Sequence, residues 1–160
     1  MKLILMRHGK ARPDAPKGDA ARELTDGGRE DVSRVGETLA ELGLGRVRAL
    51  VSPSARTRQT LEAVSRRLDV EPTFVEELYN ASLERMIHEA ELVSDGAGTA
   101  LIIGHNPGIT ALLIHLLDGG TEGMKPGDAA VVELPQGASQ GTARLLHYIR
   151  PSDRRDEAPA

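Results

Sequence analysis

The sequence predicts an α/β fold: a three-layer α/β/α sandwich around a mostly parallel central sheet. Short apolar runs alternate along the chain with segments of helical period, and most of the runs end in polar residues or glycine. This alternation is typical of a parallel sheet with helices on both faces. The length of 160 residues, with 39% apolar and 28% charged residues, suits one domain with one substantial core, expected over residues 1–150.

Each element in the first half of the chain has its own signal. Leu3-Ile4-Leu5 is the centre of a buried strand, and Thr25 is a helix cap before a segment with one apolar face. Leu61 and Val64 lie on the apolar face of the next helix. In chain order, we expect a strand over 2–6, a polar loop over 7–23, a helix over 26–42, a strand over 47–51, a helix over 55–68 and a short strand over 72–75.

The second half continues the alternation and then changes it. Two apolar runs close the chain with glycines between them, and this spacing predicts an antiparallel hairpin added to the parallel sheet. Residues 151–160 are charged, rich in alanine and proline and without apolar period, so we expect a disordered tail. In chain order, the elements are a helix over 83–93, a strand over 99–103, a helix over 109–117 and strands over 129–134 and 143–149.

Composition excludes several classes of protein. The net charge of −4 argues against a nucleic-acid binder. The absence of cysteine excludes disulfide scaffolds, thiol nucleophiles, cysteine zinc sites and iron–sulfur clusters. The apolar run before Arg7 is too short for a signal peptide or a membrane span, so we expect a cytoplasmic protein with no membrane partner. Sixteen of the 20 basic residues are arginine, which suits bidentate binding of anions.

Candidate functional residues follow the strands, at the sheet edge where α/β proteins bind ligands. Arg7-His8-Gly9 follows the first strand, and the segment from Ser52 to Thr57, which contains Arg56, follows the second. Glu76-Glu77 follows the third strand, and Gly104-His105-Asn106 follows the fourth. Two histidines and two arginines from three strand ends are therefore expected to converge.

Two helix starts support an anion at this edge. Ser52-Pro53 and Asn106-Pro107 each place a capping residue before a proline, the preferred order at a helix N-terminus. Free backbone N–H groups and the helix dipole favour an anion there. Arg56 is expected in the first turn of its helix, close to that anion.

Two histidines with two arginines suit phosphoryl transfer better than metal binding. The sequence offers no third histidine or carboxylate set nearby, and arginine is unfavourable beside a cation, so we expect no metal and no cofactor. One histidine attacks phosphorus while arginines neutralise the equatorial oxygens. Taken singly, each motif is also an ordinary strand exit or helix cap. The remaining histidines, His88, His115 and His147, are expected to be surface or core residues.

At these residues the sequence resembles the histidine phosphatase, or phosphoglycerate mutase-like, superfamily. The similarity runs from about residue 1 to 150 and is greatest to the small phosphohistidine phosphatases of the SixA type. Four motifs carry it: Arg7-His8-Gly9, Leu24-Thr25-x-x-Gly28, Ser52-Pro53-x-x-Arg56-Thr57-x-Gln59-Thr60 and Gly104-His105.

The resemblance implies a role for each matching residue. His8 is the implied nucleophile, and Arg7, Arg56 and His105 complete the phosphate pocket. Arg22, which precedes Leu24-Thr25, is a further candidate substrate or phosphate contact. Asn106 and Ser52 are added as candidate phosphate contacts.

One departure concerns the proton donor. Larger members of the superfamily carry Arg-His-Gly-Glu and a carboxylate acid within an insertion, whereas Lys10 follows Gly9 here. The interval from Glu77 to Thr99 leaves little room for an insertion, and Glu77 is the nearest candidate acid. A weak acid handicaps release of an alkoxide more than release of an imidazole, which favours an N-phosphorylated substrate.

Three functions remain open at this point. The first is a metal-independent phosphatase acting through a phosphohistidine intermediate on phosphohistidine in a protein. The second is a phosphatase of the same superfamily for small phosphomonoesters, and the third is a non-catalytic module that binds phosphate or phosphohistidine. The partner is thus a phosphorylated protein or a small phosphorylated molecule. The sequence sets no oligomeric state and is compatible with a monomer.

Overall fold

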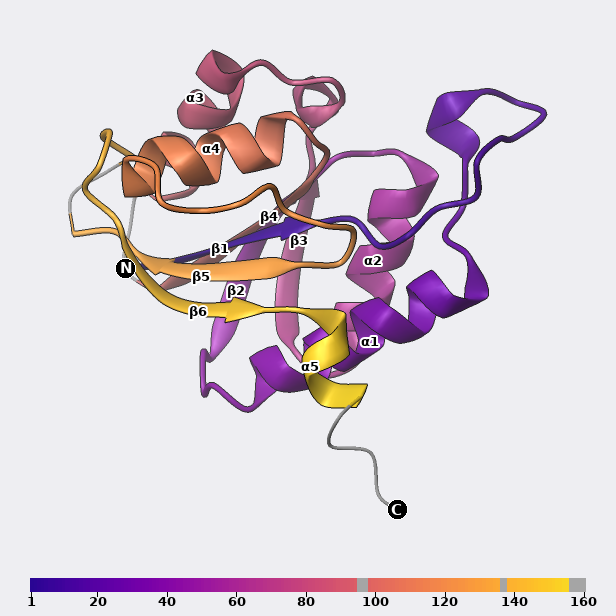
Figure 1. The fold of residues 1–160 in the computed structure, drawn as a ribbon, viewed down its shortest axis with the longest axis horizontal. Helices are drawn as coiled ribbons and strands as arrows, with labels where there is room; N and C mark the ends of the chain where they lie inside the picture. The colour runs from indigo at the N-terminus through magenta and orange to yellow at the C-terminus, as the bar shows by residue number, and fades with distance from the viewer. Residues whose placement is uncertain (95–97, 136–137, 156–160) are drawn as a thin grey trace.

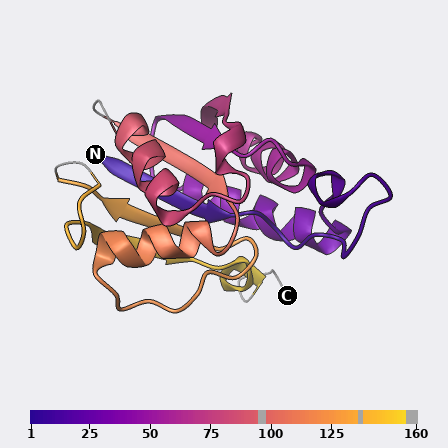
Figure 2. The ribbon, with the colours of Figure 1, turned by 90° about the horizontal axis from the view of Figure 1, so that it is seen from above.

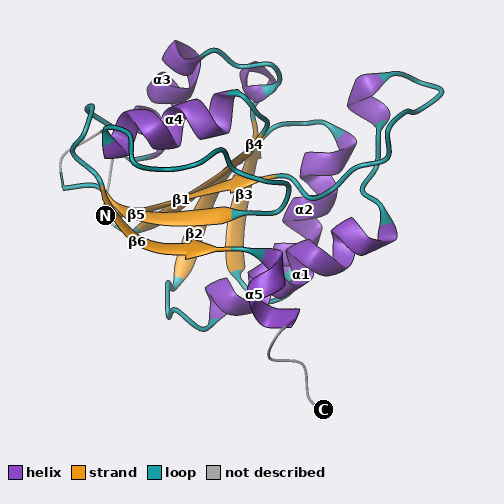
Figure 3. Ribbon diagram, viewed as in Figure 1, coloured by secondary structure: helices purple, strands orange, loops and turns teal. Residues whose placement is uncertain are grey.

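A computed structural model of the chain describes residues 1–94, 98–135 and 138–155. A six-stranded sheet with the order β3-β2-β4-β1-β5-β6 lies between two layers of helices (Figures 1 and 3). Strands β1 to β4 are parallel to one another, whereas β5 is antiparallel to β1 and to β6. The predicted α/β/α sandwich and its closing hairpin are therefore confirmed.

The strands and helices alternate along the chain until the hairpin. The strands are β1 (Lys2–Arg7), β2 (Arg46–Val51), β3 (Asp69–Phe74), β4 (Thr99–Gly104), β5 (Ala129–Glu133) and β6 (Arg144–Ile149). The helices are α1 (Asp26–Ala40), α2 (Ala55–Ser65), α3 (Leu83–Val93), α4 (Gly108–Leu117) and α5 (Pro151–Arg155), with 3-10 turns η1 (Asp19–Ala21) and η2 (Glu76–Leu78).

Alternation of side chains along the central strands builds two cores, one on each face of the sheet. Ile4 and Met6 of β1 pack with α1 and α2, whereas Leu3 and Leu5 pack with α3 and α4. All four of these side chains are fully buried. Seen from above, the helices of the two layers lie on opposite sides of the strands (Figure 2). The core is almost entirely aliphatic, as the scarcity of aromatic residues requires.

Three local expectations were wrong. The cap of α2 is Ser54 rather than Ser52, because the Ser54 hydroxyl accepts from the backbone N–H of Thr57. The cap of α4 is Pro107 rather than Asn106. In both motifs the extra residue extends the turn between strand and helix. Strand β3 starts at Asp69 rather than at residue 72, because its pairing with β2 and not its apolar content defines it.

The C-terminal segment also differs from the expected disordered tail. Pro151–Arg155 forms α5, which packs on α1. Proline suits the first helical turn, and the Asp153 carboxylate accepts from the backbone N–H of Arg150 at 2.8 Å. So short a helix contains no full apolar period, which is why the sequence pattern missed it. The rest of the expected tail, 156–160, lies outside the described residues.

Residues 10–24 form an arm that projects from the body of the molecule (Figures 1 and 2). Its base is closed by an antiparallel bridge between Ala11 and Leu24. Gly28 in the first turn of α1 packs directly on this base, since a Cβ atom there would lie 2.2 Å from the backbone oxygen of Lys10. Thr25 caps α1 as expected, accepting from the N–H of Gly28. No helix in the described ranges has the length and apolar character needed to cross a bilayer.

Candidate active site

The two motif histidines lie side by side because they follow neighbouring parallel strands. Arg7 of β1 is in register with Gly104 of β4, so His8 and His105 leave the sheet together. The backbone N–H of His8 donates to the Gly104 oxygen at 3.2 Å. The centroids of the two imidazole rings are 5.2 Å apart, with 58° between the ring planes. Main-chain hydrogen bonds of the central sheet thus set the spacing of the pair.

His8 is held as a neutral imidazole with one free nitrogen. Its Nδ1 atom lies 2.7 Å from the backbone oxygen of Gly9. Because a carbonyl only accepts, Nδ1 carries the hydrogen and Nε2 carries the lone pair. Burial lowers the pKa of His8 to about 4; the hydrogen bond to Gly9 opposes this shift, and the charges of Arg56 and Arg7 add to it. At neutral pH, Nε2 is therefore available as a nucleophile.

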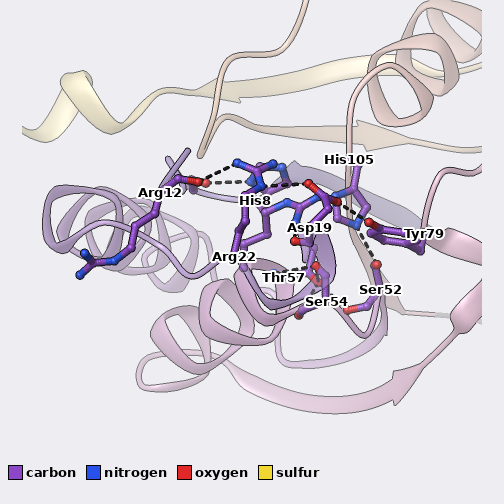
Figure 4. Close-up of polar contacts among 11 residues, drawn as sticks. His8, Arg12, Asp19, Arg22, Ser52, Ser54, Thr57, Tyr79 and His105 are labelled. Atoms are coloured by element: carbon purple, nitrogen blue, oxygen red, sulfur yellow. Dashed lines mark hydrogen bonds and ion pairs between the residues drawn. The ribbon is translucent and has the colours of Figure 1, made fainter. Parts of the chain in front are cut away.

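His105 is also buried and neutral. Burial, then the neighbouring His8 and Arg56, lower its pKa to about 3. Its Nε2 atom lies 2.7 Å from the hydroxyl of Ser52 (Figure 4), whereas Nδ1 is buried and has no partner within the described residues. When Ser52 donates to Nε2, Nδ1 carries a hydrogen that needs an acceptor. Ring edge contact with Tyr79, at 5.4 Å between centroids, fixes the other side of the imidazole.

Both motif arginines are anchored by backbone oxygens and keep donors unused. Arg7 Nη1 donates to the Met124 oxygen at 2.9 Å, and Arg56 Nη1 donates to the Asp19 oxygen at 2.8 Å. The Nε atoms of both arginines are buried without a partner among the described residues. Burial lowers the pKa of Arg7, and the nearby Asp128 opposes this shift. Buried donors without acceptors are costly, so each guanidinium is prepared for an anion.

The histidines and arginines line a common pocket of about 290 Å³ at the carboxyl edge of the sheet. Lys10 and Arg22 add two further cationic side chains, and no carboxylate is among its lining residues. The full lining is Arg7, His8, Lys10, Ala11, Arg22, Arg56, Asn80, His105, Asn106 and Pro126. Such a pocket favours a small, multiply charged anion.

The other predicted site residues have varied positions. Arg22 lines the pocket and donates through Nε to Asp19 at 2.9 Å. Asn106 also lines it, but its side chain is bonded within the protein: Nδ2 donates to the Met124 oxygen at 2.9 Å and Oδ1 accepts from Thr110 at 2.6 Å. Ser52 acts on the histidine rather than lining the pocket. Glu77 is exposed on η2 and is not among the lining residues.

Two residues of the site were missed by the sequence analysis. Asp19, on the arm, accepts hydrogen bonds from Arg22, Arg56 and the Tyr79 hydroxyl (Figure 4). These contacts, led by those of Tyr79 and Arg22, hold the pKa of Asp19 far below its usual range. The spacing Asp19-x-x-Arg22 was the available signal, because residues three apart meet in a helical turn. Tyr79 gave none beyond its place after the third strand.

Within the described ranges, no group of three or more His, Asp or Glu side chains is placed to hold a metal ion. The pocket itself presents guanidinium and ammonium groups, which repel a cation.

Comparison with known proteins agrees with this geometry. Residues 3–89, just over half of the chain, match the histidine phosphatase superfamily (branch 1). The chain belongs to this superfamily. It is accordingly a phosphatase, a hydrolase of phosphoryl groups, with the phosphoglycerate mutase-like fold.

Several relatives match over most of their length. The phosphohistidine phosphatase SixA of Escherichia coli strain K12 is 32% identical over 130 residues, which cover 78% of this chain and 79% of SixA. An uncharacterized protein of Mycobacterium tuberculosis strain H37Rv is 35% identical over 130 residues, 80% of this chain and 77% of that protein. The structure of the protein histidine phosphatase SixA complexed with tungstate superposes with a TM-score of 0.84 at 27% identity, covering 96% of this chain and 99% of that one.

Proposed function

We propose that the protein is a metal-independent phosphatase that removes the phosphoryl group from phosphohistidine in a protein, through a phosphohistidine intermediate at His8. The observation that carries the proposal is the state of His8: neutral, with Nε2 free, beside His105 and within a cluster of arginines. A pure phosphate-binding module has no need of such a nucleophile.

The proposed reaction has two steps. Nε2 of His8 attacks phosphorus, the bond between phosphorus and the substrate nitrogen breaks, and the departing imidazole takes up a proton from solvent. Water then attacks the phosphorus of phosphorylated His8, the P–Nε2 bond breaks, and inorganic phosphate leaves. Arg7 and Arg56, joined by Arg22, stabilise the charge on the equatorial oxygens in both steps, and Nδ1–H of His105 donates to one of them.

The choice of substrate is supported by the lining of the pocket. An alkoxide is a poor leaving group and needs a strong acid, whereas an imidazole leaves from phosphorus readily. The lining contains no carboxylate acid, and the exposed position of Glu77 gives it no part in this proposal. The similarity to phosphohistidine phosphatase SixA supports the same class of substrate. In this proposal Ser52 holds the ring of His105 through its hydrogen bond, and Asn106 forms part of the pocket wall.

His8→Ala tests the nucleophile. Turnover of a phosphoramidate is expected to fall to background, and the acid-labile phosphoenzyme trapped by rapid quench is expected to disappear. His88→Ala, on the exposed face of α3, is the matched control and should keep both. Full activity of His8→Ala with an unchanged circular dichroism spectrum would disprove the assignment.

A substrate comparison tests the leaving group. The rates kcat/KM are measured on a phosphohistidine-containing protein, on free phosphohistidine and on a panel of phosphate esters. Preference for the protein supports the proposal, and preference for an ester assigns the protein to small-molecule phosphatases instead. Binding of all of them with no release of phosphate would identify a non-catalytic module.

A further inference from the structure

Asp19, on the arm, contacts two of the arginines that line the pocket, Arg22 and Arg56. The Asp19 carboxylate accepts from Arg22 Nε at 2.9 Å, from Arg56 Nη2 at 3.1 Å and from the Tyr79 hydroxyl. Its backbone oxygen accepts from Arg56 Nη1 at 2.8 Å. Arg22 is fixed from another side, because its Nη1 donates to the backbone oxygen of Arg12 at 2.7 Å. Both pocket arginines that are not on β1 are therefore held by one residue.

Asp19 contacts the pocket arginines but is not itself a lining residue. Arg22 and Arg56 line the pocket, whereas Asp19 does not. The Arg56 side chain is 6% exposed and that of Asp19 is 50% exposed, so the carboxylate occupies the solvent side of the pair. Two donors of Arg56 go to Asp19, and the buried Nε has no partner among the described residues. A guanidinium has further N–H groups, which remain for a ligand.

We propose that Asp19 is a positioning residue for phosphoryl transfer: it fixes the orientation of Arg56 and Arg22 so that their free donors meet the equatorial oxygens of the phosphoryl group. The inference rests on the proposed function for the identity of that ligand. The proposed effect of Asp19 is on how tightly the site binds the pentacoordinate phosphoryl group, and not on the reactivity of His8. Fixed donors stabilise a transition state without reorganisation at the moment of reaction, which is why a residue outside the pocket affects the rate.

Two features favour positioning over the opposite role, in which Asp19 competes with the substrate for the arginines. A competing anion has to occupy the ligand's place, and Asp19 is not among the lining residues. One of the two hydrogen bonds between Asp19 and Arg56 is accepted by the backbone oxygen of Asp19. This oxygen is neutral, so the charge of a ligand does not displace it. The contact with Tyr79, whose pKa is raised mainly by this hydrogen bond, holds the carboxylate from a third direction.

Asp19→Asn distinguishes the two roles by the sign of its effect. The affinity for vanadate, a mimic of the pentacoordinate phosphoryl group, is expected to weaken by about tenfold, the effect of one charge-assisted hydrogen bond. Asp14→Asn, an exposed carboxylate on the same arm outside the pocket, is the matched control and should leave it unchanged. Tighter vanadate binding by Asp19→Asn would identify a competing anion, and unchanged binding would also overturn the proposal.

A double-mutant cycle separates positioning from a loss of folding. If Asp19 acts through Arg56, Asp19→Asn should weaken vanadate binding much less in an Arg56→Lys background than in the wild-type protein. Full additivity would show that Asp19 acts independently, for instance by destabilising the arm, and would refute the inference. A direct effect also requires kcat to fall with little change in the thermal unfolding midpoint. If the proposed function is wrong, His8→Ala will still turn over substrate. The vanadate affinities of the Asp19 variants do not depend on that result and test the positioning role separately.

Discussion

Replacing Ser52 by alanine tests whether the second histidine depends on its hydrogen bond. The Ser52 hydroxyl is fully buried and lies 2.7 Å from His105 Nε2, and His105 is 8% exposed. The variant leaves a buried ring nitrogen without a partner, which costs about 1–3 kcal/mol of the free energy of unfolding. Without the Ser52 hydroxyl, nothing on this side of the ring holds His105 in the tautomer in which Nδ1 carries the hydrogen. Because about 1.4 kcal/mol of transition-state stabilisation is tenfold in rate, we expect kcat/KM to fall at least about tenfold.

The measurements are urea unfolding and steady-state kinetics, with Ser94→Ala as the matched control. The Ser94 hydroxyl is buried but has no partner in the described part of the chain, so its removal should cost almost nothing. Comparison of the two variants isolates the hydrogen bond from the loss of a buried oxygen atom. If Ser52→Ala is as stable and as active as Ser94→Ala, Ser52 does not hold His105, and the assignment of Nδ1 as a donor loses its support.

Three further predictions follow from the geometry. Since His8 must be neutral to attack and burial lowers its pKa to about 4, kcat/KM should stay flat above about pH 5 and fall below about pH 4; after correction for substrate ionisation, an inflection near pH 6.5 in the pH–rate profile would contradict this. Gly28→Ala should lower the free energy of unfolding by more than about 2 kcal/mol, because its Cβ meets a backbone oxygen at 2.2 Å, whereas Gly27→Ala, with open space around it, should stabilise α1 slightly in the same denaturation assay. Thr110→Val removes the hydroxyl that accepts from the Met124 N–H at 3.0 Å, and the Met124 backbone oxygen in turn accepts from Arg7. We therefore expect vanadate affinity to fall by about tenfold in Thr110→Val and to be restored in Thr110→Ser; equal affinity in all three proteins would show that Thr110 does not position Arg7.

The sequence identified what depends on strand order and strand ends. Parallel strands bring their carboxyl ends to one edge, so the pocket that contains His8, Arg56 and His105 was predictable from the residues that follow the strands. The helix caps were less predictable. Ser52 and Ser54 both precede α2, and only the length of the turn decides that Ser54 caps it while Ser52 faces His105.

Contacts between distant segments were not predictable. Nothing in the sequence pattern shows that the arm folds back so that Asp19 meets Tyr79, which is 60 residues away. The same limit explains Asn106: its position after a strand suggested a ligand contact, whereas the fold directs its amide to Met124. The sequence thus indicates which side chains lie near the site more readily than it indicates which groups they contact.

The shared register of β1 and β4 separates two properties of the pocket. The histidine spacing depends on main-chain bonds at the centre of the sheet, whereas the arginine orientations depend on side-chain contacts with the arm and with the loop that carries Met124. Substitutions in the arm and that loop can therefore alter which phosphorylated group fits without changing the distance between the two imidazoles. The arm and the loop that carries Met124 therefore affect how well the arginines stabilise the transferring phosphoryl group, whereas the sheet sets the distance between His8 and His105.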